Sequence, residues 1–461
     1  MQTVVIGGGI AGLTAAYELI RAGHRPILIE PASIGGMIAS EQSDGFTLEC
    51  GPNVLVERPA VMSLVRELDL SSSLRYPAVK LYGQYVWFNG RAQKVPAGVL
   101  EAIATPLISF GAKLALPLRV VRSGVLEPRA EDESVETFFS RLIGRTASRA
   151  MLDPVLKGIY GGNVEELSAR SLFSGLWDAG RRGCSVVQYM RERPKGGKPS
   201  IFVIEGGIQT LVDTLWRRIE GDLDFVADAA CAVTRVGAAR YGIMTQSGGL
   251  FETDRCIITT AGANLAPLVR SIGPDAAQMI DRMRYASLTV VHLSTPRDQR
   301  LIRDAFGMLC PAGMPENFLG VMFNSQIFPG MAPPDKHLLT VILGGAQAGD
   351  SAPNEQAIRE AVPRLLSEML DIRDAKILRM TQWRRAIPQL VVGHFRLLEA
   401  LDALEHNAPG LVFAGVDRGG IGVSDRIRLA CEAVKRSAER LASVSDTKQA
   451  GRRYEGEELR S

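Results

Sequence analysis

The residues that most clearly indicate chemistry form a glycine-rich turn near the start of the chain. They have the spacing GxGxxG and are Gly7, Gly9 and Gly12. The turn follows a β-branched run at residues 3–6 and opens a helical pattern at residues 10–22, and a second strand-like run at residues 26–30 ends in Glu30. Such glycines permit a tight turn, close approach of the backbone to a pyrophosphate, and close packing of helix on strand. The helix N-terminus offers N–H groups to phosphates and Glu30 offers a carboxylate to ribose hydroxyls, so the stretch predicts a dinucleotide site that disfavours a 2′-phosphate.

Two further glycine turns distinguish between dinucleotides. Gly35 and Gly36 follow directly after the acid, and the stretch GFTLECGPNVL comes next. A simple NAD dehydrogenase rarely needs this second turn, whereas a chain that wraps a permanently bound flavin does. The third turn, GGIGVSD at residues 419–425, precedes the last helical pattern, whose N-terminus would stabilise negative charge on a reduced flavin. A plain helix cap by Ser424 or Asp425 is the alternative, and it is compatible with the flavin interpretation.

Composition excludes several classes of protein. A formal net charge of +3 over 461 residues gives no electrostatic indication of a nucleic-acid partner. The six cysteines are scattered without a CxxC pair, and no histidines cluster, so neither a metal site nor a disulfide framework is expected. The N-terminus leads straight into a strand, with no secretory leader. We therefore expect a cytoplasmic protein.

One apolar segment, residues 95–121, resembles a membrane element. Glu101, Lys113 and three prolines interrupt it before a twenty-residue apolar span is reached, so a single-pass helix is not expected. Two alternatives stay open, a monotopic surface that enters one leaflet at the inner face of the cell membrane and a buried helical hairpin.

The remaining patterns predict a mixture of helices and strands. A hairpin is expected at residues 85–96 with its turn at Asn89-Gly90, and residues 106–193 are mainly helical. Strands are expected at residues 255–261, 288–294 and 338–345.

Several further blocks occur in a characteristic order. They are residues 131–145, 152–173 with the Leu167-Ser168 pair, 306–311 with 319–329, 340–345, 383–394 and 414–425. In this order the chain resembles the protoporphyrinogen oxidase family of the FAD-dependent amine-oxidase-like superfamily, over nearly its whole length to about residue 442.

The resemblance implies an α/β fold in three parts. A Rossmann-like FAD-binding domain would comprise residues 1–80, 195–270 and 385–445, and a mixed-sheet substrate domain would comprise residues 81–95 and 271–384. Residues 96–194 would form a helical, membrane-associated insert. Residues 446–461 are polar and are expected to form a disordered tail.

The resemblance also implies the reaction. Protoporphyrinogen IX would lose six electrons and six hydrogens to give protoporphyrin IX in heme biosynthesis. Hydride would pass to N5 of FAD, and oxygen would reoxidise the cofactor to give hydrogen peroxide. No protein base is assigned, because pyrrole nitrogens can carry the protons, and no catalytic triad, metal motif or paired carboxylates occur in the motif blocks.

Site residues follow from matching positions. Those matching the family's FAD site are Gly7, Gly8, Gly9, Ile10, Ala11, Gly12, Glu30, Met37, Gly51, Pro52, Asn53, Val54, Val233, Trp383, Ile421, Gly422 and Val423. Those matching its substrate pocket are Gly158, Phe306, Gly307, Leu309 and Ile342. Leu309 and Ile342 would sandwich a pyrrole ring, and the alternative for each is a plain core residue. Val233 would lie beside the adenine.

Three positions depart from the family's pattern. Met37 stands where many relatives have a cation, and Gln84 stands where eukaryotic members place an arginine for a propionate. Asn53 stands where relatives carry an acid or a base, so only a backbone role is assigned to it. Other cations could hold the substrate carboxylates, although each is expected to be a solvated surface charge. These cations are Lys80, Arg91 and Lys157.

Other functions stay open at this point. Coproporphyrinogen III, with four carboxylates, is the alternative substrate, and the apolar segment favours the less polar protoporphyrinogen. Another flavin oxidoreductase of the superfamily, such as an amine oxidase or a carotenoid desaturase, is the second possibility, although aromatic residues for a cage make up only 6% of the chain. A non-catalytic flavin-binding protein is the third. Oxygen or a quinone is expected as acceptor, because a second GxGxxG for a nicotinamide is absent, and no feature indicates an oligomeric state.

Overall fold

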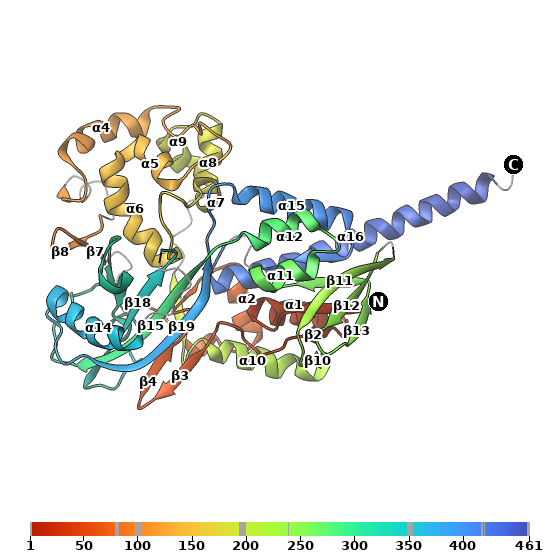
Figure 1. Ribbon diagram of the computed structural model, residues 1–461, viewed down its shortest axis with the longest axis horizontal. Coiled ribbons are helices and arrows are strands. Elements are labelled where there is room, and N and C mark those ends of the chain that lie inside the picture. Colours follow the sequence, from red (N-terminus) through yellow and green to blue (C-terminus); the bar gives the residue numbers. More distant parts are fainter. Residues whose placement is uncertain are drawn as a thin grey trace.

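The computed structural model describes residues 2–78, 83–96, 101, 104–192, 200–237, 239–347, 354–415, 418 and 420–458. Figure 1 shows three groups of elements, with a helix-covered parallel sheet at the right, a mixed sheet at the lower left and a group of helices at the upper left.

The parallel sheet has the strand order β10-β2-β1-β14-β20. Its strands are β1 (Thr3–Ile6), β2 (Ile27–Ile29), β10 (Asp224–Val226), β14 (Arg255–Ile258) and β20 (Leu411–Phe413). Every neighbouring pair is parallel, so the carboxyl ends of the strands meet at one edge of the sheet. Ligands of open α/β sheets bind at this edge.

Both faces of the parallel sheet are covered, which is why its strands are continuous apolar runs. One face packs on α1 (Ile10–Arg21), α10 (Gln209–Ile219) and the first part of α16 (Val423–Glu458), with α2 (Pro59–Glu67) alongside. The other face packs on α11 (Gly262–Val269), α12 (Pro274–Asp281), α15 (His394–Asn407) and the small sheet of β11 (Ala230–Gly237), β12 (Arg240–Thr245) and β13 (Leu250–Thr253).

The second large sheet is mixed and has the order β19-β15-β18-β17-β16-β7-β8. Its strands are β7 (Gln84–Phe88), β8 (Arg91–Lys94), β15 (Tyr285–Pro296), β16 (Gly307–Leu309), β17 (Phe318–Met322), β18 (Lys336–Gly345) and β19 (Lys376–Pro388). Only the β16–β7 pair is parallel among the described pairings of this sheet. Helix α14 (Glu355–Leu370) packs against one face, and α6 (Arg145–Tyr160) lies against β7, β16, β17 and β18.

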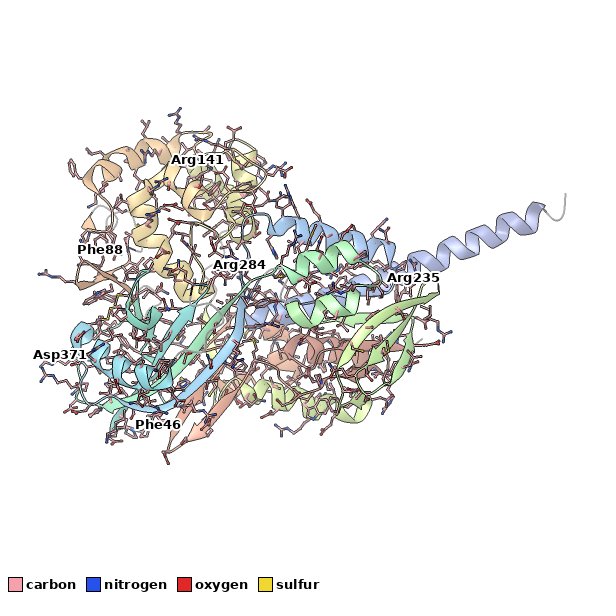
Figure 2. The ribbon with its side chains drawn as sticks, in the orientation of Figure 1. Phe46, Phe88, Arg141, Arg235, Arg284 and Asp371 are labelled. Atoms are coloured by element: carbon pink, nitrogen blue, oxygen red, sulfur yellow. The ribbon has the colours of Figure 1, made fainter. Side chains whose placement is uncertain are left out.

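Short strands join the two sheets. They are β3 (Ser40–Ser43), β4 (Phe46–Glu49), β5 (Leu55–Val56), β6 (Leu74–Arg75) and β9 (Ile201–Ile204), with the one-turn helix α13 (Asn324–Ile327) near β18. The β3–β4 hairpin carries Phe46, labelled near the lower edge of the molecule in Figure 2.

The helical group has its own apolar core. Besides α6 it contains α4 (Phe110–Val121), α5 (Val135–Ile143), α7 (Ala169–Leu172), α8 (Ser174–Arg181) and α9 (Val186–Glu192). Of the apolar segment 95–121, residues 97–100 and 102–103 lie outside the described residues. No helix in the described ranges is long and apolar enough to cross a bilayer.

The helical group is fastened to the loop that follows β19. Ser168 N donates to Leu390 O at 2.8 Å, and Val392 N donates to Glu166 O at 2.9 Å. The Glu166 carboxylate also pairs with Arg284 at 2.9 Å, close to the centre of the molecule in Figure 2. Further along the loop, a backbone N–H of residue 393 donates to a carboxylate oxygen of residue 132 at 2.7 Å.

The predicted fold class is confirmed. The glycine turn joins β1 to α1, and the predicted hairpin is the β7–β8 pair, with Asn89 in a left-handed conformation at its turn. Helix α16 continues to Glu458 and projects from the body in Figure 1.

Candidate functional site

The glycine turn has the geometry of a phosphate-binding loop. Gly7 has φ +107°, a conformation that glycine adopts without strain, and a Cβ on Gly12 would overlap the carbonyl oxygen of Gly7. Gly9 precedes α1 without a side-chain cap, and a Cβ built on it meets no atom within 4 Å. The N–H groups of the first turn of α1 therefore have no capping side chain, as an anion site requires.

Glu30 lies where the sequence predicts, at the end of β2 beside the turn. Its carboxylate accepts hydrogen bonds from Gly8 N at 2.6 Å and from Ala32 N at 2.9 Å. These two bonds hold the acid next to the glycine turn, where it can also accept bonds from ribose hydroxyls.

The second glycine turn packs directly on the first. Gly35 N donates to Gly8 O at 2.9 Å, and Gly35 forms an isolated β-bridge with Gly9. A Cβ on Gly51 would overlap the carbonyl oxygen of Met37, so the two segments pass each other at a distance that only glycine allows. The predicted residues Gly7 to Gly12, Glu30, Met37 and Gly51 thus lie in one cluster.

The remaining cofactor positions join this cluster from distant elements. Trp383 on β19 donates its indole N–H to Cys50 O at 2.7 Å, next to the predicted stretch Gly51, Pro52, Asn53 and Val54. Ser424 in the first turn of α16 donates to Val56 O and accepts from Val56 N, which brings Ile421, Gly422 and Val423 to the same loop.

Two buried polar atoms beside these loops have no partner among the described residues, namely Asn53 Oδ1 and Thr260 Oγ1. Because buried polar groups are nearly always hydrogen-bonded, these atoms fit a polar ligand in the cluster. Val233 differs from the other positions. Its side chain is fully buried in the core, and its carbonyl accepts a bond from Ser271 Oγ at 2.7 Å.

A buried carboxylate stands behind this loop. Glu49 ends β4 and is 1% exposed, and it accepts bonds from Ser40 Oγ at 2.6 Å and from Ile208 N at 2.9 Å. Burial raises the pKa of Glu49 to about 7, against the opposing effect of the two hydrogen bonds. The sequence analysis did not single out this group, since a Glu in a strand normally faces solvent.

The five predicted substrate residues line one apolar cavity of about 130 Å³ between α6 and strands β16–β18. They are Gly158, Phe306, Gly307, Leu309 and Ile342. Gly158 faces Leu309 so closely that a Cβ on it would overlap the Leu309 side chain. None of the described lining residues is ionisable, so the cavity itself offers no acid or base.

Other lining residues were missed by the sequence analysis. They are Val155, Ile159, Met308, Leu319, Gly320, Val321 and Met322, together with Gln84, which was noted only as a departure. Several of them belong to α6, β16 and β17, and their role becomes visible only when the helix is placed over the sheet.

The cavity adjoins the dinucleotide cluster. Phe306 and Val54 both pack against the apolar cluster that contains Cys50. At the end of α6, burial and the carboxylate of Asp425 raise the pKa of Tyr160. The apolar cavity and the predicted cofactor loop thus share the cluster around Cys50.

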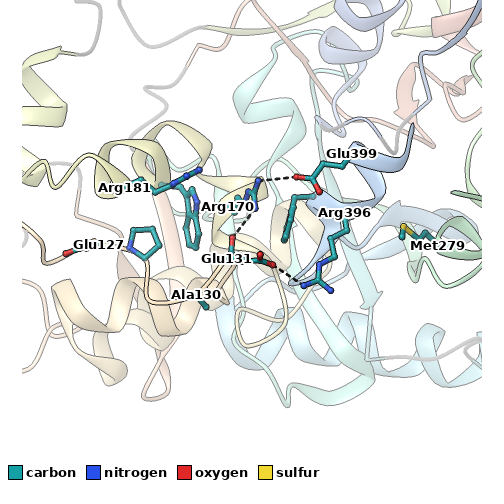
Figure 3. Close-up of a pocket in the computed structure, with 11 residues that line it drawn as sticks. Glu127, Ala130, Glu131, Arg170, Arg181, Met279, Arg396 and Glu399 are labelled. Carbon is teal, nitrogen blue, oxygen red and sulfur yellow. Dashed lines mark hydrogen bonds and ion pairs between the residues drawn. The ribbon is translucent and has the colours of Figure 1, made fainter. Parts of the chain in front are cut away.

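A larger cavity of about 890 Å³ lies elsewhere, between the helical group and α12 and α15 (Figure 3). Arg170 donates to Glu131 O at 3.1 Å and lies 3.7 Å from the centre of the Phe395 ring, and Arg396 pairs with Glu131 at 3.0 Å. The cavity is lined by both arginine and glutamate side chains, and these form ion pairs with one another. None of the predicted site residues lines it.

One prediction about cations is wrong. Lys157 was expected to be a solvated surface charge, but its side chain is only 6% exposed, within α6. Arg91 is exposed as expected, and Lys80 lies outside the described residues.

Comparisons with known proteins agree with this geometry. A family model described as flavin-containing amine oxidoreductase matches residues 10–426. Protoporphyrinogen oxidase 2 of Arabidopsis thaliana is 25% identical over 97% of this chain and 96% of its own length. Coproporphyrinogen III oxidase of Bacillus subtilis is 25% identical over 92% of this chain and 95% of its own length. A crystal structure of a candidate protoporphyrinogen oxidase from Exiguobacterium sp. 255-15 has a TM-score of 0.78 at 21% identity, covering 96% of this chain and 99% of that one.

Fold and glycine cluster together define a flavoprotein oxidoreductase. The chain belongs to the flavin-containing amine oxidoreductase family. The predicted resemblance is confirmed, with relatives named protoporphyrinogen oxidase and coproporphyrinogen III oxidase. The glycine cradle and the two unpartnered buried oxygens fit a flavin cofactor, which would be held by residues 7–12, Glu30, the 51–54 loop and the start of α16.

Proposed function

We propose that this protein is an FAD-dependent oxidase that converts protoporphyrinogen IX to protoporphyrin IX. The observation that carries the proposal is the apolar cavity, in which five predicted residues from three separate segments meet. FAD is the flavin of choice because the cluster includes a ribose-binding acid and a helix N-terminus for a pyrophosphate.

When bound, FAD would supply the acceptor for a hydride from a bridge carbon, and oxygen would take the electrons from it as hydrogen peroxide. Three such rounds remove the six electrons and six hydrogens, and each round consumes one oxygen molecule. The chain's own contribution is to orient the ring between Leu309 and Ile342 and to exclude water. No protein base is needed, because the pyrrole nitrogens carry the departing protons.

The size of the cavity sets how much of the substrate it can hold. About 130 Å³ is below the roughly 300 Å³ at which pockets for whole drug-sized ligands begin. The cavity therefore accepts one pyrrole ring with its reacting bridge, and the other rings extend beyond it.

Aerobic incubation of the purified protein with protoporphyrinogen IX and, separately, coproporphyrinogen III tests the proposal. Porphyrin fluorescence should rise faster with protoporphyrinogen than in a heat-inactivated control, with three molecules of peroxide per porphyrin. The flavin released by denaturation should chromatograph as FAD. Faster oxidation of coproporphyrinogen would assign the activity of the Bacillus subtilis relative instead, and oxidation of neither would refute a porphyrinogen oxidase.

The proposal includes a peripheral contact with the inner leaflet of the cell membrane. Along α4, four apolar side chains at helical spacing are exposed: Phe110 by 76%, Leu114 by 68%, Leu118 by 69% and Val121 by 59%. A stripe of this kind inserts into the interface of a bilayer. Leu114→Asp with Leu118→Asp should abolish flotation with anionic lipid vesicles, whereas Leu250→Asp, at a 67% exposed position on β13, should not. If the α4 variant floats with vesicles as the wild-type protein does, α4 is not the membrane contact.

A further inference from the structure

Lys157 lies at the boundary between the apolar cavity and a polar one. Its neighbour Gly158 lines the apolar cavity, whereas Lys157 itself lines a second cavity of about 590 Å³ on the other side of α6. The floor of this second cavity includes Trp87 and Phe88 from the end of β7, and Phe88 is labelled at the left of Figure 2.

Two segments, the one that contains β16 and helix α6, contribute lining residues to both cavities. Along β16, Leu309 lines the apolar cavity, and two residues later Pro311 lines the polar one. Along α6, Gly158 lines the first cavity and Lys157 the second, and Leu309 lies close to Gly158. Because Lys157 and Gly158 are consecutive, a carboxylate on a ring bound next to Gly158 is within a few ångströms of the α6 turn that carries the ammonium.

The Lys157 side chain is buried and charged. Within the described part of the chain its one charged partner is Asp153, one helical turn earlier, with Nζ and Oδ2 3.4 Å apart. The same carboxylate oxygen of Asp153 accepts a bond from Ala312 N at 3.3 Å. An ammonium has three donors, so Lys157 can bind a second anion besides Asp153.

The other cations of the polar cavity are paired as well, but they are exposed to solvent, Arg149 by 52% and Arg145 by 75%, against 6% for Lys157. Arg149 pairs with Glu136 at 2.6 Å and also with Glu165, and Arg145 lies 3.6 Å from Glu136. Gln84, the polar side chain in the apolar cavity, is uncharged. Lys157 is therefore the cation best placed to receive an added carboxylate.

We propose that Lys157 binds a carboxylate of the porphyrinogen and fixes which ring enters the apolar cavity. The proposal rests on the porphyrinogen oxidase function and assigns to Lys157 the binding of a carboxylate side chain of that substrate. Asp153 holds the ammonium in place before substrate binds and competes with the substrate carboxylate for it. Lys157 is thus a specificity-determining residue, not a catalytic one.

The test compares two variants of the ion pair on two forms of the substrate. Lys157→Met should raise KM for protoporphyrinogen IX about 10- to 100-fold, the loss expected for one charge-assisted hydrogen bond, with a much smaller effect on kcat. On protoporphyrinogen dimethyl ester, which has no carboxylate, Lys157→Met and wild type should have the same KM. Asp153→Asn removes the competing anion and keeps an acceptor for Ala312 N, so it should lower KM for the free acid.

The opposite changes in KM expected for Lys157→Met and Asp153→Asn distinguish carboxylate binding from a purely structural role of the ion pair. If the pair only stabilises α6, Lys157→Met and Asp153→Asn should impair the protein alike and equally on acid and ester, which would overturn the proposal. Melting temperature and flavin content are measured for each variant. Should Lys157→Met fail to fold, the double variant Asp153→Asn/Lys157→Met leaves no unpaired charge and must show the same acid-selective rise in KM.

The result is distinguishable from failure of the proposed function. A wild-type protein that oxidises neither the acid nor the ester refutes porphyrinogen oxidation itself. A wild-type protein that oxidises both, with KM of Lys157→Met unchanged on the acid, refutes only the role of Lys157. Fluorescence titration with protoporphyrin IX and its dimethyl ester gives the same comparison without turnover, since Lys157→Met should weaken binding of the acid alone.

Discussion

Substitutions at Gly9 and Gly12 of the first turn should distinguish an effect on cofactor binding from an effect on folding. A Cβ on Gly12 would lie 1.7 Å from the carbonyl oxygen of Gly7, whereas ordinary contact begins at 3.4 Å, so the backbone would have to move by about 1.7 Å. Forced overpacking of this kind costs about 3 kcal/mol or more. A Cβ on Gly9 meets nothing within 4 Å and points into the space beside the free helix N-terminus.

We therefore expect opposite behaviour from two equally small substitutions. Gly9→Ala should leave the melting temperature of the flavin-free protein within about 1 °C of wild type, because it adds no overlap within the chain. It should weaken flavin binding about 5- to 150-fold, the equivalent of roughly 1–3 kcal/mol of crowding against the bound pyrophosphate. Gly12→Ala should lower the melting temperature of the flavin-free protein by roughly 5 °C.

The assay is flavin titration and thermal unfolding of the flavin-free form of each variant, with Gly23→Ala as a control at another glycine of the same unit. Gly23 has a positive φ and open space around it, so Gly23→Ala shows the effect of backbone strain alone, without steric overlap. A Gly9→Ala protein that binds flavin like wild type would refute the assignment of this turn to the pyrophosphate. A Gly12→Ala protein as stable as wild type would refute the packing argument.

Three further outcomes are expected. Below pH about 4.5 the Glu49 carboxyl is protonated in both the folded and the unfolded state, and as the pH rises to about 7 the unfolded state loses its proton first. The free energy of unfolding should therefore fall by about 3 kcal/mol over this window. Denaturant titration at a series of pH values measures this fall, and Glu49→Gln should flatten it. Gly158→Val would push Leu309 into the cavity and should reduce porphyrinogen turnover at least tenfold while the bound flavin spectrum stays that of wild type; unchanged turnover would move the substrate elsewhere. Glu30→Ala should weaken flavin binding by about 1–3 kcal/mol, and equal affinity in a titration of the flavin-free protein would show that the acid does not bind ribose.

The sequence was most informative where local geometry and chemistry coincide. A strand, three glycines, a helix and an acid occupy one short stretch, so their positions in the structure follow from local rules, and Glu30 lies where these rules place it. The apolar cavity is different, because Gly158 and Leu309 are brought together only by the packing of α6 on the mixed sheet. Their meeting was expected from the family resemblance, not from residue patterns.

Burial of single charges could not be predicted from the sequence. Lys157 and Glu49 have the residue types of surface positions, and nothing in their neighbourhoods marks them as buried.

The fastening of the helical group to the loop after β19 has a kinetic consequence. The backbone bonds of Glu166 and Ser168 to this loop tie the segment that follows α6 to the rest of the molecule, so opening the cavity by lifting α6 would require these bonds to break. For the porphyrinogen proposed as substrate, the oxidised product is planar and stiffer than its precursor. Release of the product would then limit the rate of the proposed cycle.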